Sequence, residues 1–162
     1  MDSTNARSAA GVSRPCGVFS SRRIAALIEA GAVGADALFA PGQVQPASLD
    51  LRLGSKAFRV RASFLPGKDR SVADMLAQLT SDEISLRDDG AVLERGCFYV
   101  VPLMERLELP PELSGAANPK SSTGRLDIFT RLITDRGERF DLAPAGYKGP
   151  LYAEISPRSF SV

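Results

Sequence analysis

The stretch "PKSSTGR", residues 119–125, brings together groups that suit a phosphate. An ammonium group, two hydroxyls and a guanidinium group come from Lys120, Ser121, Ser122 and Arg125. Gly124 lets backbone amides approach a ligand closely, and amides and cations together bind phosphate oxygens. The pattern is not a Walker phosphate loop, which needs G-x-x-x-x-G-K-[ST]. A Ser/Thr/Gly turn with solvated cations is an equally good interpretation of these residues alone.

The chain contains no histidine and two cysteines, Cys16 and Cys97. Zinc-dependent base deaminases require H-x-E and P-C-x-x-C motifs, and the sequence contains neither. Histidine general bases and Ser-His-Asp triads are excluded by the same count. Carboxylates, lysine, tyrosine or bound water remain for proton transfer, and we expect no zinc and no protein-held metal.

The overall charge and composition predict a cytoplasmic protein with one core. A net charge of +1 with 24% charged residues gives no field that would attract nucleic acid or an anionic membrane. No apolar run approaches the roughly 20 residues of a membrane helix. Two cysteines without a secretory segment indicate a reducing compartment. With 44% apolar residues, the chain is long enough for a single domain.

Periodic patterns predict the elements that must position these residues. Short helices are expected from Ser21, with Gly31 as the stop, and after Ser71. Strands are expected in "SLDLRLGSKAFRV" (48–60), with a bend at Gly54, and in "CFYVV" (97–101), "RLDIFTRLI" (125–133) and "GPLYAEI" (149–155), with a hairpin turn at "DDG" (88–90). Together with eleven prolines, these elements predict a mainly-β barrel or sandwich with a few short helices.

Residues 1–14 lack periodicity, which predicts a disordered tail before one domain at 15–162. The chain ends in "SFSV", an alternating apolar stretch without a turn or a polar tail. We therefore expect the domain to be incomplete at its C-terminus.

Three stretches in fixed order resemble one known family. They are "VQPASLDLRLG" (44–54), "PKSSTGR" (119–125) and "AGYKGPLYAEI" (145–155). Together they resemble the deoxycytidine triphosphate deaminases, in the superfamily of the trimeric deoxyuridine triphosphatases, and in particular the first half of a longer, two-domain bacterial form.

The resemblance implies a distorted β-barrel, a homotrimer and zinc-independent hydrolysis of dCTP to dUTP and ammonia, a step in the synthesis of deoxypyrimidine nucleotides. The triphosphate would carry Mg²⁺. Lys120, Ser121 and Ser122 match the residues that contact the phosphates and the catalytic water region. Arg125 matches an arginine close to the base and the reacting centre.

The resemblance also assigns Glu154 as the general acid and base, because the family's glutamate lies at this distance after a D-P-G-[FWY]-x-G turn. The local pattern alone favours an exposed strand residue, since Glu154 alternates away from Leu151 and Ala153. Tyr147 is the aromatic residue of the turn, and it lies either near the nucleoside or in the barrel wall. The "LDL" aspartate, Asp50, is interpreted as structural.

One departure concerns the turn, where Pro144 replaces the family's usual aspartate. This change argues against diphosphatase chemistry on dUTP and weakens the case for deoxyribose recognition. Asp141 could take that place only if its loop follows a different path. Two alternatives remain open: a deoxyuridine triphosphate diphosphatase or bifunctional enzyme, and a catalytically weak domain that binds nucleotide or supports a trimer.

Overall fold

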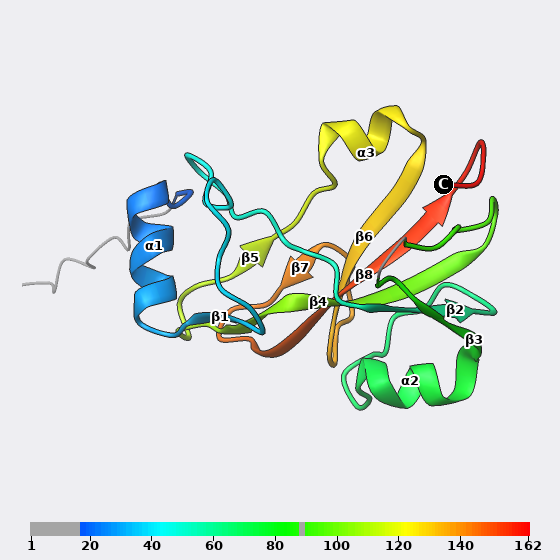
Figure 1. Ribbon diagram of the computed structural model, residues 1–162. Coiled ribbons are helices and arrows are strands. Elements are labelled where there is room, and N and C mark those ends of the chain that lie inside the picture. Colours follow the sequence, from blue (N-terminus) through cyan, green and yellow to red (C-terminus); the bar gives the residue numbers. More distant parts are fainter. Residues whose placement is uncertain (1–16, 88–89) are drawn as a thin grey trace, which may run out of the picture.

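A computed structural model, which describes residues 17–87 and 90–162, contains one main antiparallel sheet. The strand order is β3-β2-β4-β8-β6, and β1 pairs with the far end of β4 (Figure 1). The strands of this sheet are β1 (Val33–Ala35), β2 (Lys56–Val60), β3 (Thr80–Ser85), β4 (Phe98–Glu108), β6 (Ile128–Thr134) and β8 (Lys148–Pro157). A second, two-stranded sheet joins β5 (Gly115–Ala116) to β7 (Leu142–Ala143). The mainly β class is confirmed, but the described strands form an open sheet, so "barrel" fits only loosely.

Strand β8 is the most enclosed strand of the molecule. It lies between β4 and β6, and residues 151–157 are all buried. Leu151, Ala153 and Ile155 pack into one apolar cluster with Tyr99 and Leu132. Tyr152, which alternates with them, packs into a second cluster with α2. Side chains on both faces of β8 are therefore shielded from water, including Glu154.

Three short helices accompany the sheet: α1 (Ser21–Glu29), α2 (Val72–Leu79) and α3 (Ser121–Arg125). The prediction that Ser71 caps α2 is confirmed, because its hydroxyl accepts the Asp74 N–H while the Asp74 carboxylate accepts the Ser71 N–H. For α1 the predicted cap was one residue off: Ser20 is the N-cap, and its side chain makes no capping hydrogen bond. Gly31 follows that helix with a φ of 76°, as a stop residue should.

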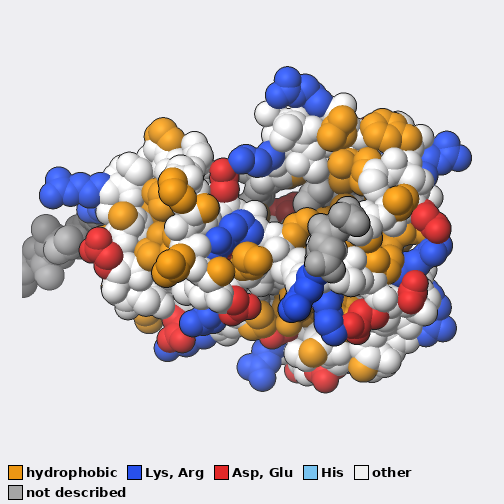
Figure 2. Space-filling model, in the orientation of Figure 1, with side chains coloured by type: hydrophobic (Ala, Val, Ile, Leu, Met, Phe, Trp, Pro, Cys, Tyr) orange, Lys and Arg blue, Asp and Glu red, His pale blue; other side chains and the backbone are white. Residues whose placement is uncertain are grey.

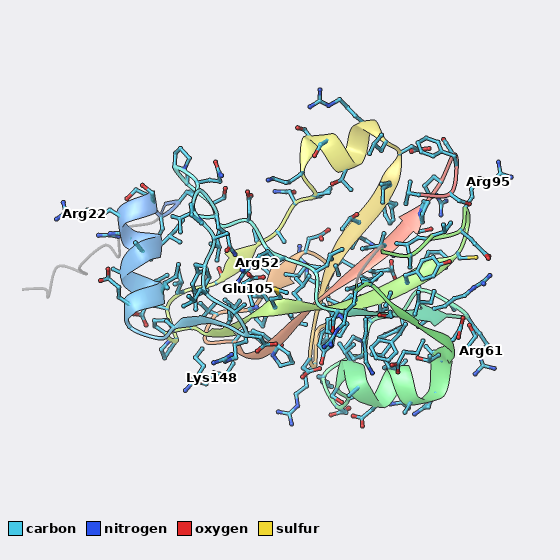
Figure 3. All side chains as sticks on the ribbon, viewed as in Figure 1. Arg22, Arg52, Arg61, Arg95, Glu105 and Lys148 are labelled. Atoms are coloured by element: carbon cyan, nitrogen blue, oxygen red, sulfur yellow. The ribbon has the colours of Figure 1, made fainter. Side chains whose placement is uncertain are left out.

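The strand predicted over residues 48–60 forms only in its second part, as β2, and residues 48–54 form no strand. The structure has only single bridges there, Val44 to Leu49 and Leu53 to Leu103. The buried Glu105 carboxylate explains the difference, because Oε2 accepts the Arg52 backbone N–H at 2.8 Å and Oε1 accepts Nε of Arg52 at 2.8 Å. A side chain thus takes one ladder position, while the Arg52 carbonyl and the Gly54 N–H still bond to the backbone of β4. Arg52 and Glu105 lie together in Figure 3.

Strand β4 runs through Pro102, which the sequence suggested would interrupt the chain. Its pairing with β8 shifts register between Pro102 and Arg106, so the irregularity is absorbed inside the strand. The predicted tail at residues 1–14 and the first two residues of the predicted turn at 88–90 lie outside the described residues. Among the described helices, none is long and apolar enough to cross a membrane.

Candidate functional site

The four predicted phosphate-binding residues lie at the start of or within α3. Lys120 is its N-cap, and Ser121, Ser122 and Arg125 belong to its single turn and a half. All four are exposed, and Figure 1 shows α3 standing at the end of β6. The predicted cluster is therefore compact and accessible, in a helical turn that the sequence analysis did not predict.

Lys120 is paired with an acidic residue from a distant loop. Its Nζ lies 2.7 Å from Oδ2 of Asp50, whose side chain is 27% exposed. The Asp50 backbone carbonyl accepts a hydrogen bond from Nε2 of Gln43, and the same amide group donates to buried Glu105. Asp50, interpreted from the sequence as structural, is therefore also the ion-pair partner of Lys120, one of the four predicted phosphate-binding residues.

Glu154 is completely buried on β8. The expectation of an exposed strand residue, drawn from alternation alone, is wrong because both faces of β8 are covered. Oε1 accepts hydrogen bonds from Nε and Nη2 of Arg131 on β6, at 3.1 and 2.6 Å. Oε2 has no hydrogen-bond partner among the described residues. One carboxylate oxygen is thus fixed and the other is free to accept a proton.

Arg131 is held by more than this ion pair. Its Nη2 donates to Oγ of Ser63 at 2.8 Å. The guanidinium group stacks on Phe140, 3.6 Å from the ring centroid, and lies 4.8 Å from the centroid of Phe129. Both Arg131 and Ser63 were missed from the sequence, although the pairing of β6 with β8 places Arg131 directly opposite Glu154.

A hollow of about 310 Å³ lies beside β6, and its described lining includes none of Lys120, Ser121, Ser122, Arg125, Tyr147 and Glu154 themselves. Pro119 and Gly124 line it from the α3 stretch, and Arg131 lines it from β6. Its volume lies at the lower end of the range of small-molecule sites. On the face shown in Figure 2, basic and acidic side chains are interspersed.

Asp141 lines the same hollow, although the sequence placed it there only under a different loop path. Its φ of 61° is unusual for a residue other than glycine. Two hydrogen bonds hold it: its Oδ1 accepts the Leu132 N–H at 2.8 Å, and its own N–H donates to the Leu132 carbonyl at 3.0 Å. The strained loop thus fixes a carboxylate at the site, while Pro144 is exposed in the turn before Tyr147.

Tyr147 lies in the core rather than at the hollow. It packs in the cluster that contains Leu151, on the face of β8 opposite Glu154. Its hydroxyl donates to the Pro150 carbonyl at 2.6 Å and accepts the Asp135 N–H at 3.1 Å. Burial raises the pKa of the Tyr147 phenol to about 12. Of the two interpretations of this residue, this position favours the structural one.

Within residues 17–87 and 90–162, no three His, Cys, Asp or Glu residues lie close enough together to bind a metal ion.

Comparisons with known proteins agree with this arrangement. Residues 15–162 match the family model described as the 2'-deoxycytidine 5'-triphosphate deaminase N-terminal domain. A crystal structure of 2'-deoxycytidine 5'-triphosphate deaminase from Agrobacterium tumefaciens is 57% identical, with a TM-score of 0.86, over 90% of this chain and 43% of that one. A dCTP deaminase of Halorubrum lacusprofundi is 31% identical over 114 residues, covering 70% of this chain and 53% of the relative.

A further relative, a dUMP-forming dCTP deaminase of Acidothermus cellulolyticus, is 36% identical over 115 residues, which cover 70% of this chain and 58% of the relative. The chain spans about half the length of the curated relatives it matches. Because the family model covers nearly the whole chain, residues 15–162, the chain belongs to the dCTP deaminase family.

Proposed function

We propose that the protein hydrolyses dCTP to dUTP and ammonia, with Glu154 as general acid and base. The single observation that supports this role best is the Glu154 carboxylate, fully buried on the central strand with Oε1 bound by Arg131 and Oε2 without a partner. A carboxylate held by a rigid element and partly free is what repeated proton transfer requires.

The reaction would proceed by addition of water and loss of ammonia. Oε2 of Glu154 accepts a proton from water as the water oxygen bonds to C4 of the base, and the same carboxyl then protonates N3. A second proton, from the new C4 hydroxyl, passes through the carboxyl group to the amino group, the C4–N4 bond breaks, and ammonia leaves. The product carries a carbonyl at C4, so dCTP and water give dUTP and ammonia.

The triphosphate would bind at α3. Lys120, Ser121, Ser122 and Arg125 are exposed there and offer two cations and two hydroxyls. Lys120 would exchange the Asp50 carboxylate for a phosphate oxygen. Mg²⁺ would be held by phosphate oxygens and water, the ligands that this ion prefers.

The assembly is proposed to be a homotrimer in the cytoplasm, with α3 of one subunit completing the site of another. The exposure of Lys120, Ser121, Ser122 and Arg125 supports this, because a substrate on one side of α3 leaves its other side open to a neighbour. The free Cys97 is compatible with a reducing compartment.

Glu154→Gln tests the proposed function. The variant keeps the shape of the side chain but cannot take up a proton, so ammonia release from dCTP with Mg²⁺ should fall by about a thousandfold or more. Binding of dCTP should persist. A variant that deaminates at the wild-type rate would refute the assignment.

A second candidate is a nucleotide-binding domain of low intrinsic activity. It is favoured by the complete enclosure of Glu154 behind Arg131. Calorimetric binding of dCTP without ammonia release would identify this candidate, whereas pyrophosphate released from dUTP would identify a diphosphatase.

A further inference from the structure

Arg131 separates Glu154 from the hollow beside α3. Its side chain is 23% exposed and lines the hollow, whereas the Glu154 side chain is 0% exposed. In the part of the chain that the structure describes, Glu154 is absent from the hollow's lining. A ligand that enters the hollow therefore meets the guanidinium group before it can meet the carboxylate.

Several partners hold the Arg131 side chain in its contact with Glu154. Two guanidinium nitrogens, Nε and Nη2, donate to Oε1 of Glu154, and Nη2 also donates to Oγ of Ser63. The ring of Phe140 supports the guanidinium plane at 3.6 Å. An arginine with an ion pair, a hydroxyl partner and an aromatic stack is ordered. Arg131 can therefore act as a plug, that is, a side chain that blocks access from the hollow to Glu154.

A guanidinium group resembles one edge of the cytosine base. Neutral cytosine presents an amino N–H donor at this edge on arrival. Once N3 has taken up its proton during the reaction, N3, C4 and the amino nitrogen form an amidinium group, which offers adjacent N–H donors and a delocalised positive charge. A carboxylate binds such a fork in the same way as it binds arginine. Uracil instead presents a carbonyl oxygen at C4, which a carboxylate repels.

From this likeness we propose that Arg131 is an internal substitute for the amidine edge of the substrate base, which occupies Glu154 until that edge displaces it. The inference rests on the proposed deaminase function. Removing Arg131 from Glu154 without a replacement would leave a buried charge unpaired, which is strongly disfavoured. The exchange is therefore linked to the arrival of an amino-bearing base, and the plug contributes to the choice of cytosine over uracil.

Carboxyl labelling tests the plug without requiring turnover. Folded protein is treated with a carbodiimide and an amine, and labelled glutamates are identified by peptide mass spectrometry. Glu154 should be protected in the wild type and labelled at least about tenfold more in Arg131→Gln, because the state in which the guanidinium group covers the carboxylate no longer dominates. Glu105 is the internal control, since it is equally buried and paired with a different arginine.

Two further variants keep the test decisive if Arg131→Gln folds poorly. Phe140→Leu keeps the apolar volume and the arginine but removes the ring face, so Glu154 labelling should rise by a smaller factor. Arg52→Gln is the matched control: it should expose Glu105 and leave Glu154 protected. Equal labelling of both glutamates in Arg131→Gln, or unchanged protection of Glu154, would overturn the proposal.

Nucleotide affinity tests the likeness to the base. Without an internal competitor, Arg131→Gln should bind dCTP about tenfold more tightly, while dUTP affinity changes less than about twofold. Affinity is measured by calorimetry, or as KM where dCTP turns over. Weaker dCTP binding, or equal changes for both nucleotides, would show that Arg131 is not a substitute for the base. If neither the wild type nor any variant releases ammonia from dCTP, but labelling of Glu154 still depends on Arg131, the deaminase proposal fails. The proposal that Arg131 encloses Glu154 then remains.

Discussion

At the residue scale, the site depends on polar groups whose neighbours decide what they do. Glu154 and Glu105 are both fully buried and both paired with an arginine. Every oxygen of Glu105 has a partner, whereas Oε2 of Glu154 has none among the described residues. A saturated carboxylate stabilises a loop, and an unsaturated one is available for chemistry.

Tyr147 provides a prediction at this scale. The pKa of its phenol is raised from 10.0 to about 12 by burial, so the folded state holds the proton more tightly than the unfolded chain. The resulting stabilisation is fully present below pH of about 10 and is lost as the pH rises toward 12. Urea unfolding at increasing pH should show this loss in the wild type and a shallower one in Tyr147→Phe.

At neutral pH, Tyr147→Phe should cost about 1–3 kcal/mol, because the Asp135 N–H and the Pro150 carbonyl lose their partner. Tyr152→Phe is the matched control. The pKa of Tyr152 is also raised to about 12, by burial and the charge of Asp135. Unlike the Tyr147 hydroxyl, the Tyr152 hydroxyl has no such pair of hydrogen bonds among the described residues, so its loss should cost less. Equal costs for the two variants would contradict the role given to the Tyr147 hydroxyl.

At the element scale, short helices are held in place by their ends and by packing. The Ser71 hydroxyl and the Asp74 carboxylate form a reciprocal capping box on α2, and hydrogen bonding to Ser71 lowers the pKa of Asp74. Ser20, the N-cap of α1, makes no such side-chain bond. The two helices thus begin with the same residue type in different roles.

This difference predicts that Ser71→Ala lowers the free energy of unfolding by about 0.5–2 kcal/mol, since it leaves orphan N–H groups at the start of α2. Ser20→Ala should change it by clearly less. Chemical denaturation of both variants measures the difference. A loss at Ser20 as large as that at Ser71 would show that side-chain capping is not the cause.

At the scale of the whole molecule, the sheet brings together segments that lie far apart in the chain. Pairing of β6 with β8 joins Arg131 to Glu154, and the Asp50 loop reaches Lys120 across 70 positions. The proposed trimer extends this organisation between chains. Light scattering should give three times the 17.3 kDa chain mass, and a mass of a single chain would contradict the trimer.

The sequence by itself predicted the mainly β class, the capped helix at Ser71, the strands that became β6 and β8, and the membership of a family. These depend on local signals, such as alternation, a capping box and motif spacing, that stand in consecutive residues. The cluster Lys120 to Arg125 was also identified in this way, and it stays a prediction as a phosphate clamp.

The tertiary structure alone decided what surrounds each of these residues. Alternation suggested an exposed Glu154, but β8 is covered on both faces, and only strand pairing shows that Arg131 encloses it. The first part of the predicted strand, residues 48–54, did not form, and the Glu105 side chain from β4 takes up the Arg52 backbone N–H there. Burial and pairing depend on contacts between distant segments, and the physical reason they escape prediction is that local periodicity describes one segment at a time.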